Sequence, residues 1–310
     1  MTVCVSMATA LAILVIMATV SAPSVRIDVA ANCFEPSSAS QYEASVLTLW
    51  NVLKHLAHKF NYGCNDKSPL SNPRTSCTAK SDRFNAFMFG SSRPVQMREY
   101  SKHMRRINAT TYCEVGMNTG LGTVAALSTH PKMVAHSFDL MEWRYTPAIV
   151  DFISMIFPGR HEVHAGSSFT TLPQFAGGVG ARSCDAALVD GAHTETGAAT
   201  DIANMRAAMK CNHVIFLDDL DQPSGTAVRA AIQRGELEML EEFSFPPDSP
   251  EACIYMYKKR QGRKHHKMLR DAAMVEEHYH LEYSCPNVEM AGGRPWAFGI
   301  ARYKNLPHCV

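Results

Sequence analysis

Three aspartates follow two apolar, strand-like segments, and their side chains could hold a cation together. Asp190 ends the segment ALVD, and Asp218 and Asp219 end the segment VIFLDD. If both segments are parallel strands of one sheet, the three carboxylates meet at the same edge, where ligands bind. They would repel each other unless a cation lay between them, and oxygen ligands of this kind suit Mg²⁺. The sequence therefore predicts a magnesium site, with one alternative: Asp190 and Asp218 only cap turns, and Asp219 and Asp221 are solvated.

A histidine lies three residues after the first of these acids. His193 follows Asp190 in the segment DGAH. Imidazole titrates near neutral pH and can accept a proton from a hydroxyl group. We therefore predict that His193 is a catalytic base beside the metal, although a lone histidine can also be structural or simply exposed.

A glycine-rich segment, TYCEVGMNTGLGT at residues 111–123, predicts where a small molecule binds. A strand-like run ends near Glu114, and Gly116, Gly120 and Gly122 follow before a helical pattern begins. Glycine lets the backbone approach a ligand closely, and the first turn of the helix leaves N–H groups unpaired. A strand, a glycine turn and a helix predict a binding loop of an open α/β sheet, although such a turn can also serve packing alone.

The order of residues in this loop, E-x-G-x-N-x-G-x-G, resembles motif I of the class I S-adenosylmethionine-dependent methyltransferases. The resemblance implies that Glu114, Gly116, Asn118 and Gly120 bind the cofactor, with the glycines beside its amino-acid end. Asn118 stands where the commonest form of the motif has glycine. The tight GxGxxG spacing of a dinucleotide site is absent.

A fourth acid, Asp139, ends the second predicted strand in the segment HSFDLM. A carboxylate at this position can accept hydrogen bonds from both ribose hydroxyls of a nucleotide. The methyltransferase resemblance implies the same role for Asp139. The alternative is an ordinary helix N-cap.

The segment HAGSSFTTLP, residues 164–173, resembles the G-D-S-x-x-T-L-P segment of one methyltransferase branch. This branch includes macrocin-type sugar O-methyltransferases and is similar in layout to catechol O-methyltransferase. The resemblance implies that Ser167 and Ser168 contact the adenine, with Ser167 in place of the usual aspartate. It also implies Asp190 as a residue shared by cofactor and Mg²⁺, with Asp218 and Asp219 as further metal ligands.

Strand and helix patterns alternate from residue 111 onward, which predicts βαβ units and a parallel sheet. The predicted strands are 111–115, 133–138, 161–165, 186–189 and 214–217. The predicted helices are 122–128, 146–157, 195–209 and 224–234. Two further strands, 237–243 and 252–257, are predicted to pair antiparallel at one sheet edge. With the resemblance, the fold class is α/β: a doubly wound, seven-stranded, mostly parallel Rossmann-like sheet with an antiparallel edge strand and a helical N-terminal extension.

The N-terminal segment is almost wholly apolar from residue 8 to residue 22 and fits the core of a secretory signal. It predicts entry into the secretory pathway, as a lumenal or secreted protein, with an uncleaved signal anchor as the alternative. The predicted organisation is a signal peptide or anchor at 1–31, a helical extension at 32–108, a cofactor-binding domain at 109–259 and a C-terminal tail at 260–310. Within the extension, helices are predicted at 41–62 and 94–107.

The chain has 10 cysteines, which fits an oxidising compartment. Four of them lie in or beside strand-like runs, where buried reduced thiols are expected: Cys113, Cys184, Cys211 and Cys253. The nearest pairs in the irregular regions are predicted as disulfides: Cys64 with Cys77, and Cys285 with Cys309.

Composition limits the partners that we expect. The 310 residues carry a formal net charge of +1, so no bulk attraction to nucleic acid is expected, and membrane contact is expected only through an uncleaved anchor. The combined interpretation is a Mg²⁺-dependent O-methyltransferase that acts on a hydroxyl of a sugar, small polyol or phenol, with a small molecule or glycan as its partner. The alternatives are a non-catalytic secreted binding module, a nicotinamide-dependent oxidoreductase and a hydroxylase. The sequence does not indicate an oligomeric state.

Overall fold

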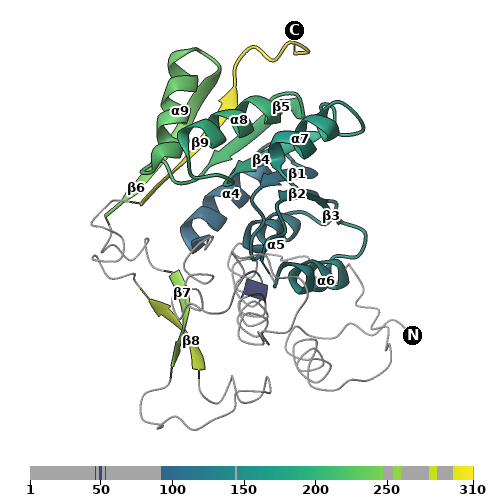
Figure 1. Ribbon diagram of the computed structural model, residues 1–310, viewed down its shortest axis with the longest axis vertical. Helices are drawn as coiled ribbons and strands as arrows, with labels where there is room; N and C mark the ends of the chain where they lie inside the picture. The colour runs from purple at the N-terminus through teal and green to yellow at the C-terminus, as the bar shows by residue number, and fades with distance from the viewer. Residues whose placement is uncertain are drawn as a thin grey trace.

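The computed structural model describes residues 92–143, 145–246 and 296–309 (Figure 1). It also describes four residues of an N-terminal helix, Val46, Leu49, Trp50 and Leu53, and the backbone of two strands, 254–259 and 279–284. The predicted leader, the predicted Cys64–Cys77 disulfide, Cys253 and Cys285 lie outside these residues.

One seven-stranded sheet organises the molecule, in the order β3-β2-β1-β4-β5-β9-β6. Its strands are β1 (Thr111–Val115), β2 (Val134–Asp139), β3 (His161–Ala165), β4 (Cys184–Val189), β5 (Met209–Leu217), β6 (Leu237–Phe245) and β9 (Trp296–Tyr303). The first five strands in the order pair in parallel, and β9 is antiparallel to both of its neighbours. The predicted doubly wound, seven-stranded, mostly parallel α/β sheet is confirmed, with the antiparallel strand one place in from the edge.

Helices cover both faces of this sheet (Figure 1). On one face lie α4 (Pro94–Arg106), α5 (Leu121–Leu127) and α6 (Thr146–Ile156); on the other lie α7 (Ser168–Ala176), α8 (Glu195–Met205) and α9 (Pro223–Gln233). The central strands are apolar on both sides: in β5, Phe216 faces the first core cluster and Ile215 the second. A strand buried on both faces reads as an apolar run, which is why these strands could be found from the sequence.

The predicted N-terminal helix is confirmed at its described residues. Val46, Leu49, Trp50 and Leu53 follow helical spacing, and none is more than 3% exposed. The Trp50 indole N–H donates to the carbonyl of Leu121 at 3.1 Å. This helix therefore packs beside the start of α5, directly behind the glycine loop.

The C-terminal region corrects two predictions. Strand β6 pairs with β9, not with the segment near 254, which instead forms β7 (Ile254–Lys259) in a separate two-stranded sheet with β8 (Tyr279–Ser284). Residues 296–303 thus complete the main sheet, so the domain does not end at 259 with a polar tail after it. The first six residues of β9 are buried, as expected for a strand between two others.

Two disulfides overturn the cysteine predictions. Cys113 of β1 bonds Cys184 of β4, and Cys211 bonds Cys309. The expectation of reduced thiols at Cys113, Cys184 and Cys211 was wrong, and so was the Cys285–Cys309 pair. Since β1 and β4 are neighbours in the sheet, two half-cystines on the same face can meet although 71 residues separate them.

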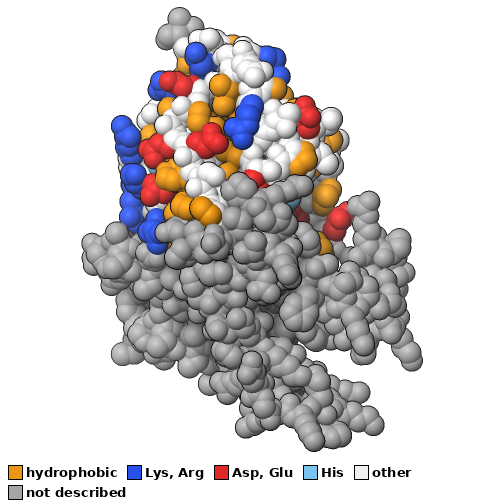
Figure 2. All heavy atoms as spheres, turned by 90° about the vertical axis from the view of Figure 1, so that its left-hand side faces the viewer, with side chains coloured by type: hydrophobic (Ala, Val, Ile, Leu, Met, Phe, Trp, Pro, Cys, Tyr) orange, Lys and Arg blue, Asp and Glu red, His pale blue; other side chains and the backbone are white. Residues whose placement is uncertain are grey.

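The described part of the molecular surface is mixed in charge. Figure 2 shows acidic, basic and hydrophobic side chains interspersed over one face. Exposed ion pairs such as Arg302–Glu238 at 2.7 Å and Arg229–Glu242 at 3.5 Å match this pattern. Among the described residues, no helix has the length and apolar character needed to cross a bilayer.

Candidate functional site

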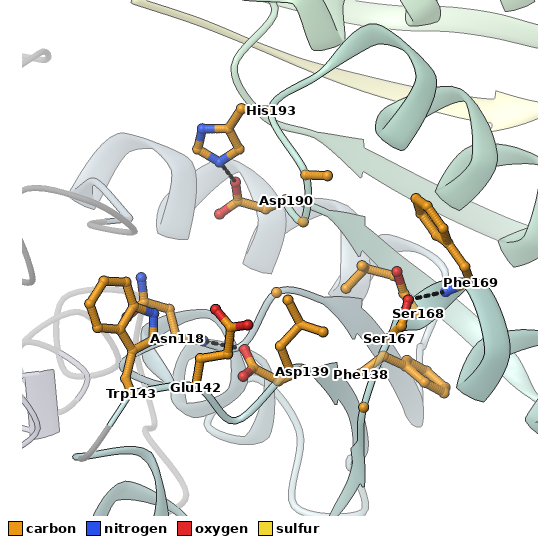
Figure 3. Close-up of a pocket in the computed structure, with 16 residues that line it drawn as sticks. Asn118, Phe138, Asp139, Glu142, Trp143, Ser167, Ser168, Phe169, Asp190 and His193 are labelled. Carbon is orange, nitrogen blue, oxygen red and sulfur yellow. Dashed lines mark hydrogen bonds and ion pairs between the residues drawn. The ribbon is translucent and has the colours of Figure 1, made fainter. Parts of the chain in front are cut away.

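A cavity of about 380 Å³ lies at the carboxyl edge of the sheet and is lined by the loops after β1, β2, β3 and β4 (Figure 3). Strands β2 and β4 flank β1 on opposite sides, so the chain leaves β1 at the point where the strand order reverses, which is where open α/β sheets bind ligands. Seven of the predicted site residues line it: Gly116, Asn118, Asp139, Ser167, Ser168, Asp190 and His193.

The loop after β1 needs glycine at its first position. Gly116 has φ +89°, and a Cβ there would lie 2.0 Å from the carbonyl oxygen of Asp190. The β1 and β4 loops therefore touch through their backbones, which no other residue would allow. Gly116 and Asp190 both line the cavity.

Asp139 holds the glycine loop against the end of β2. Its Oδ2 accepts from the backbone N–H of Met117 at 2.9 Å and of Asn118 at 3.0 Å. Its Oδ1 accepts from the N–H of Met141 at 2.7 Å. A carboxylate has about four lone-pair sites, so it can still accept from a ligand hydroxyl that enters the cavity.

The two serines after β3 use their hydroxyls inside the protein. Ser167 is the N-cap of α7, and its Oγ accepts from the N–H of Phe169 at 3.3 Å. The hydroxyl of Ser168 donates to Asp201 of α8 at 2.7 Å. Both residues line the cavity. The N-cap favours a helix in this segment, for which the sequence analysis predicted none.

Glu114 lies beneath the loop and does not line the cavity. Its carboxylate is buried and accepts hydrogen bonds from Tyr112 Oη at 3.1 Å, Ser137 Oγ at 2.8 Å and Thr123 Oγ1. A Cβ on Gly122 would lie 2.8 Å from the same carboxylate. The predicted cofactor residue Glu114 thus joins β1, β2 and α5, and Gly120, at the N-cap of α5, is likewise outside the lining.

Glu114→Gln is expected to flatten the pH dependence of stability. Burial raises the pKa of Glu114 from 4.5 to about 7, so the folded protein holds this proton more tightly than the unfolded chain. Its contribution to stability is complete below pH 4.5 and is lost as pH rises towards 7, a change of about 3 kcal/mol. Urea unfolding at several pH values should show this loss in the wild type and not in the variant. Glu195→Gln, at an exposed glutamate, should keep the wild-type profile; an unchanged slope in Glu114→Gln would refute the assignment.

The predicted base lies between two of the predicted metal ligands. His193 Nε2 is 3.5 Å from Asp190 Oδ1, and His193 Nδ1 is 3.2 Å from Asp219 Oδ2. Asp218 lies beside them, but its Oδ1 accepts from the N–H of Asp219 at 2.8 Å. The structure therefore brings all four predicted residues together, with His193 bridging Asp190 and Asp219.

The carboxylates and the imidazole of these residues shift one another's pKa. The hydrogen bond to Asp190 raises the pKa of His193, and the charge of Asp219 adds to this effect. Burial raises the pKa of Asp190 and Asp219, and the nearby charge of Asp218 raises both further. Asp190, Asp218, Asp219 and His193 together form an acid cluster in which negative charge exceeds positive charge. A proton or a cation is therefore bound favourably there.

Arg93 is a functional candidate that the sequence analysis missed. It is the N-cap residue of α4, and its guanidinium lies 3.8 Å from the centroid of the Trp296 ring. The charges of Asp218 and Asp219 raise its pKa, although burial lowers it more. No local pattern marks this residue, because it reaches the acids only when α4 and β9 pack at the same end of the sheet.

The acid cluster fits a divalent cation. One ligand atom each from Asp190, His193 and Asp219 lies within 4.8 Å of the others. Two carboxylates with water match the oxygen preference of Mg²⁺, while direct ligation by the imidazole would favour a transition metal. The donor set therefore suits Mg²⁺ when His193 stays free of the metal.

Residues 113–220 match a family described as a methyltransferase domain. The matched segment includes the four cavity loops and the acids after β5. A search of curated proteins finds no match.

Among the solved structures that match this chain are three methyltransferases of low sequence identity. An O-methyltransferase from Bacillus cereus, in complex with S-adenosylhomocysteine, is 12% identical, with 69% of this chain and 82% of that chain covered and a TM-score of 0.43. The O-methyltransferase TomG from Streptomyces achromogenes, in complex with S-adenosylmethionine, has the same values. A precorrin-6y C5,15-methyltransferase from Geobacter metallireducens is 12% identical, with 66% and 87% covered and a TM-score of 0.40. The family match and the order of the sheet support a class I S-adenosylmethionine-dependent methyltransferase domain.

Proposed function

We propose that this chain is an S-adenosylmethionine-dependent O-methyltransferase that uses Mg²⁺. One observation carries the proposal: a single cavity joins a glycine loop and the carboxylate of Asp139 on one side to Asp190 and His193 on the other (Figure 3). The first pair of features suits a nucleoside with an amino-acid end, and the second suits proton transfer beside a cation.

The cofactor would lie along the lower wall of the cavity in Figure 3. Its amino-acid end would meet the loop at Gly116, and its ribose hydroxyls would donate to Asp139. The adenine would lie towards Ser167 and Ser168, next to Phe169, whose side chain is 46% exposed. A volume of about 380 Å³ falls within the usual range of small-molecule sites.

His193 would accept the proton of the acceptor hydroxyl, because a cation held by Asp190 and Asp219 would offset the hydrogen bond and charge that raise the pKa of its imidazole, so that the ring would first lose its own proton. Its two ring nitrogens face the carboxylates of Asp190 and Asp219, which stabilise the imidazolium that forms. The new C–O bond forms as the C–S bond of the sulfonium breaks, and the electron pair of that bond stays on sulfur. The cavity contributes by holding the hydroxyl oxygen in line with the methyl carbon, at about 3 Å.

Asp190 and Asp219, with Asp218 beside them, would hold Mg²⁺. When bound there, Mg²⁺ would supply a Lewis acid that lowers the pKa of an acceptor hydroxyl. The residues of the chain then keep the acceptor close to His193 and exclude bulk water from the sulfonium.

The acceptor that we propose is a sugar or a small phenol with neighbouring hydroxyls, since two adjacent oxygens suit chelation. We also propose a lumenal or secreted location. The apolar N-terminal run and the disulfides Cys113–Cys184 and Cys211–Cys309 support an oxidising compartment.

Titration calorimetry followed by mass spectrometry tests the proposal. The full chain should bind S-adenosylmethionine, and labelled cofactor with Mg²⁺ should methylate at least one sugar, glycan or phenol in a panel. Heat with a nicotinamide dinucleotide and none with S-adenosylmethionine would favour the oxidoreductase alternative. Cofactor binding without transfer to any acceptor, with or without Mg²⁺, would favour a non-catalytic binding module.

A further inference from the structure

A second group of metal-ligating side chains lies on β2 and β3, outside the cavity. It consists of His136, Glu162 and His164. His136 is in register with Glu162, and Phe138 with His164, so the three side chains project from the same face of the sheet. None of the three lines the cavity, and none has a part in the proposed methyl transfer.

The spacing of the ligand atoms suits a tetrahedral ion. His136 Nδ1 lies 3.3 Å from His164 Nε2 and 3.4 Å from Glu162 Oε2. One ligand atom from each residue lies within 4.8 Å of the others. A tetrahedral Zn²⁺ with bonds of about 2.0–2.1 Å places its ligand atoms about 3.3–3.4 Å apart. The separations of His136 Nδ1 from His164 Nε2 and from Glu162 Oε2 therefore match two edges of such a tetrahedron.

Aromatic rings pack against the two imidazoles and hold them in place. The ring of Phe138 stacks on His164 with centroids 4.6 Å apart, and Phe175 of α7 packs against His136 at 4.8 Å. Burial lowers the pKa of His136 and of His164, which favours the neutral form of each ring, the form with a free lone pair. Ligands held by packing bind metal with little loss of conformational freedom.

We propose that His136, Glu162 and His164 form a Zn²⁺ site, completed by water, that clamps the edge strand β3 to β2. The Glu162 side chain is 63% exposed and leaves the ion a path from solvent. Strand β2 ends at Asp139, and β3 leads directly into Gly166 and Ser167. The ion would therefore stiffen the two strands that carry one wall of the cofactor cavity.

The test uses the full chain, stripped with a chelator and titrated with Zn²⁺ by calorimetry and with Co²⁺ by visible absorption. Because the acid cluster could also take these ions, the titration is repeated in the Asp219→Asn background. There we expect the site at His136, Glu162 and His164 to remain, with the strong d–d bands of tetrahedral Co²⁺. Glu162→Gln, His136→Gln and His164→Gln should each weaken it by about tenfold or more.

The control is His161→Gln, at a histidine of β3 whose ring is on the opposite face and contacts Ser137 Oγ at 2.9 Å. It should keep wild-type Zn²⁺ affinity. Thermal melting checks the fold of each variant. If the histidine variants unfold, the Zn²⁺ affinity of Glu162→Gln tests the proposal alone, because substitution of the exposed Glu162 should leave the fold intact. Equal affinity in wild type and Glu162→Gln, or no tetrahedral Co²⁺ spectrum, would overturn the proposal. Methyl transfer has no part in these readouts, so failure of the proposed function would leave them unaffected.

Discussion

Asp219→Asn is expected to slow methyl transfer by about a thousandfold while binding of S-adenosylmethionine stays close to that of the wild type. The reason is that the Asp219 carboxylate faces His193 at 3.2 Å but does not line the cavity. Asparagine keeps the shape of the side chain and tolerates the left-handed backbone of this residue, whose φ is +54°. The variant therefore removes the negative charge with little backbone strain. Product formation measures the rate of methyl transfer, and calorimetry measures the affinity for S-adenosylmethionine.

Asp221→Asn is the matched control for this experiment. Asp221 is two residues away, and its Oδ1 accepts from the N–H of Ala297 at 3.2 Å, outside the bridge with His193. It should keep most of the wild-type rate. If Asp219→Asn and the wild type had equal rates of methyl transfer, Asp219 would have no part in the mechanism. If these rates were also the same with a chelator as with Mg²⁺, the metal would have none either.

Gly116→Ala is expected to destabilise the fold by about 3 kcal/mol or more and to abolish measurable cofactor binding. The added Cβ would lie 2.0 Å from the carbonyl oxygen of Asp190, on a backbone with φ +89°. To relieve this contact, the loops after β1 and β4 must separate, which widens the cavity between Gly116 and Asp190. Urea unfolding and cofactor titration measure the two losses.

Gly159→Ala separates backbone strain from the steric contact. Gly159 also has a positive φ, +70°, but a Cβ there would meet no atom within 4 Å. It should cost only about 1 kcal/mol and leave cofactor binding intact. If both variants lost stability equally, the contact between the two loops would not be what requires glycine at position 116.

Local patterns in the sequence predict where helices and strands lie in the chain better than they predict which strands pair with one another. Strands β1 and β3 have the predicted bounds, because the glycines beside them, such as Gly116 and Gly166, mark where a strand ends without reference to its neighbours in the sheet. Helix α7 was not among the predicted helices: its segment contains Pro173 and four serines and threonines, which lower helix propensity, while the N-cap at Ser167 favours a helix. The place of β9 could not be predicted, since it depends on pairing with strands about 80 and 60 residues earlier in the chain.

The candidate site shows the same limit. Residues at the ends of strands, such as Asp139 and Asp190, line the cavity as the strand pattern predicts. Glu114 is one residue before the end of β1, and alternation along the strand turns its side chain into the core beneath the loop. Arg93 and the partners of each half-cystine come from elements far away in the sequence, so only the folded chain brings them together.

The position of β9 has a consequence for how the protein is made. Strand β6 ends at Phe245 and β9 begins at Trp296, so at 5–20 residues per second the ribosome would need about 3–10 s to supply the strand that fills the gap between β5 and β6. During that interval β5 offers an unpaired edge to any other nascent strand. Cys211 at the same time lacks its partner, Cys309, and is open to oxidation with another thiol. Chaperones and disulfide isomerases that act during synthesis should therefore affect the yield of this protein more strongly than its final stability would suggest.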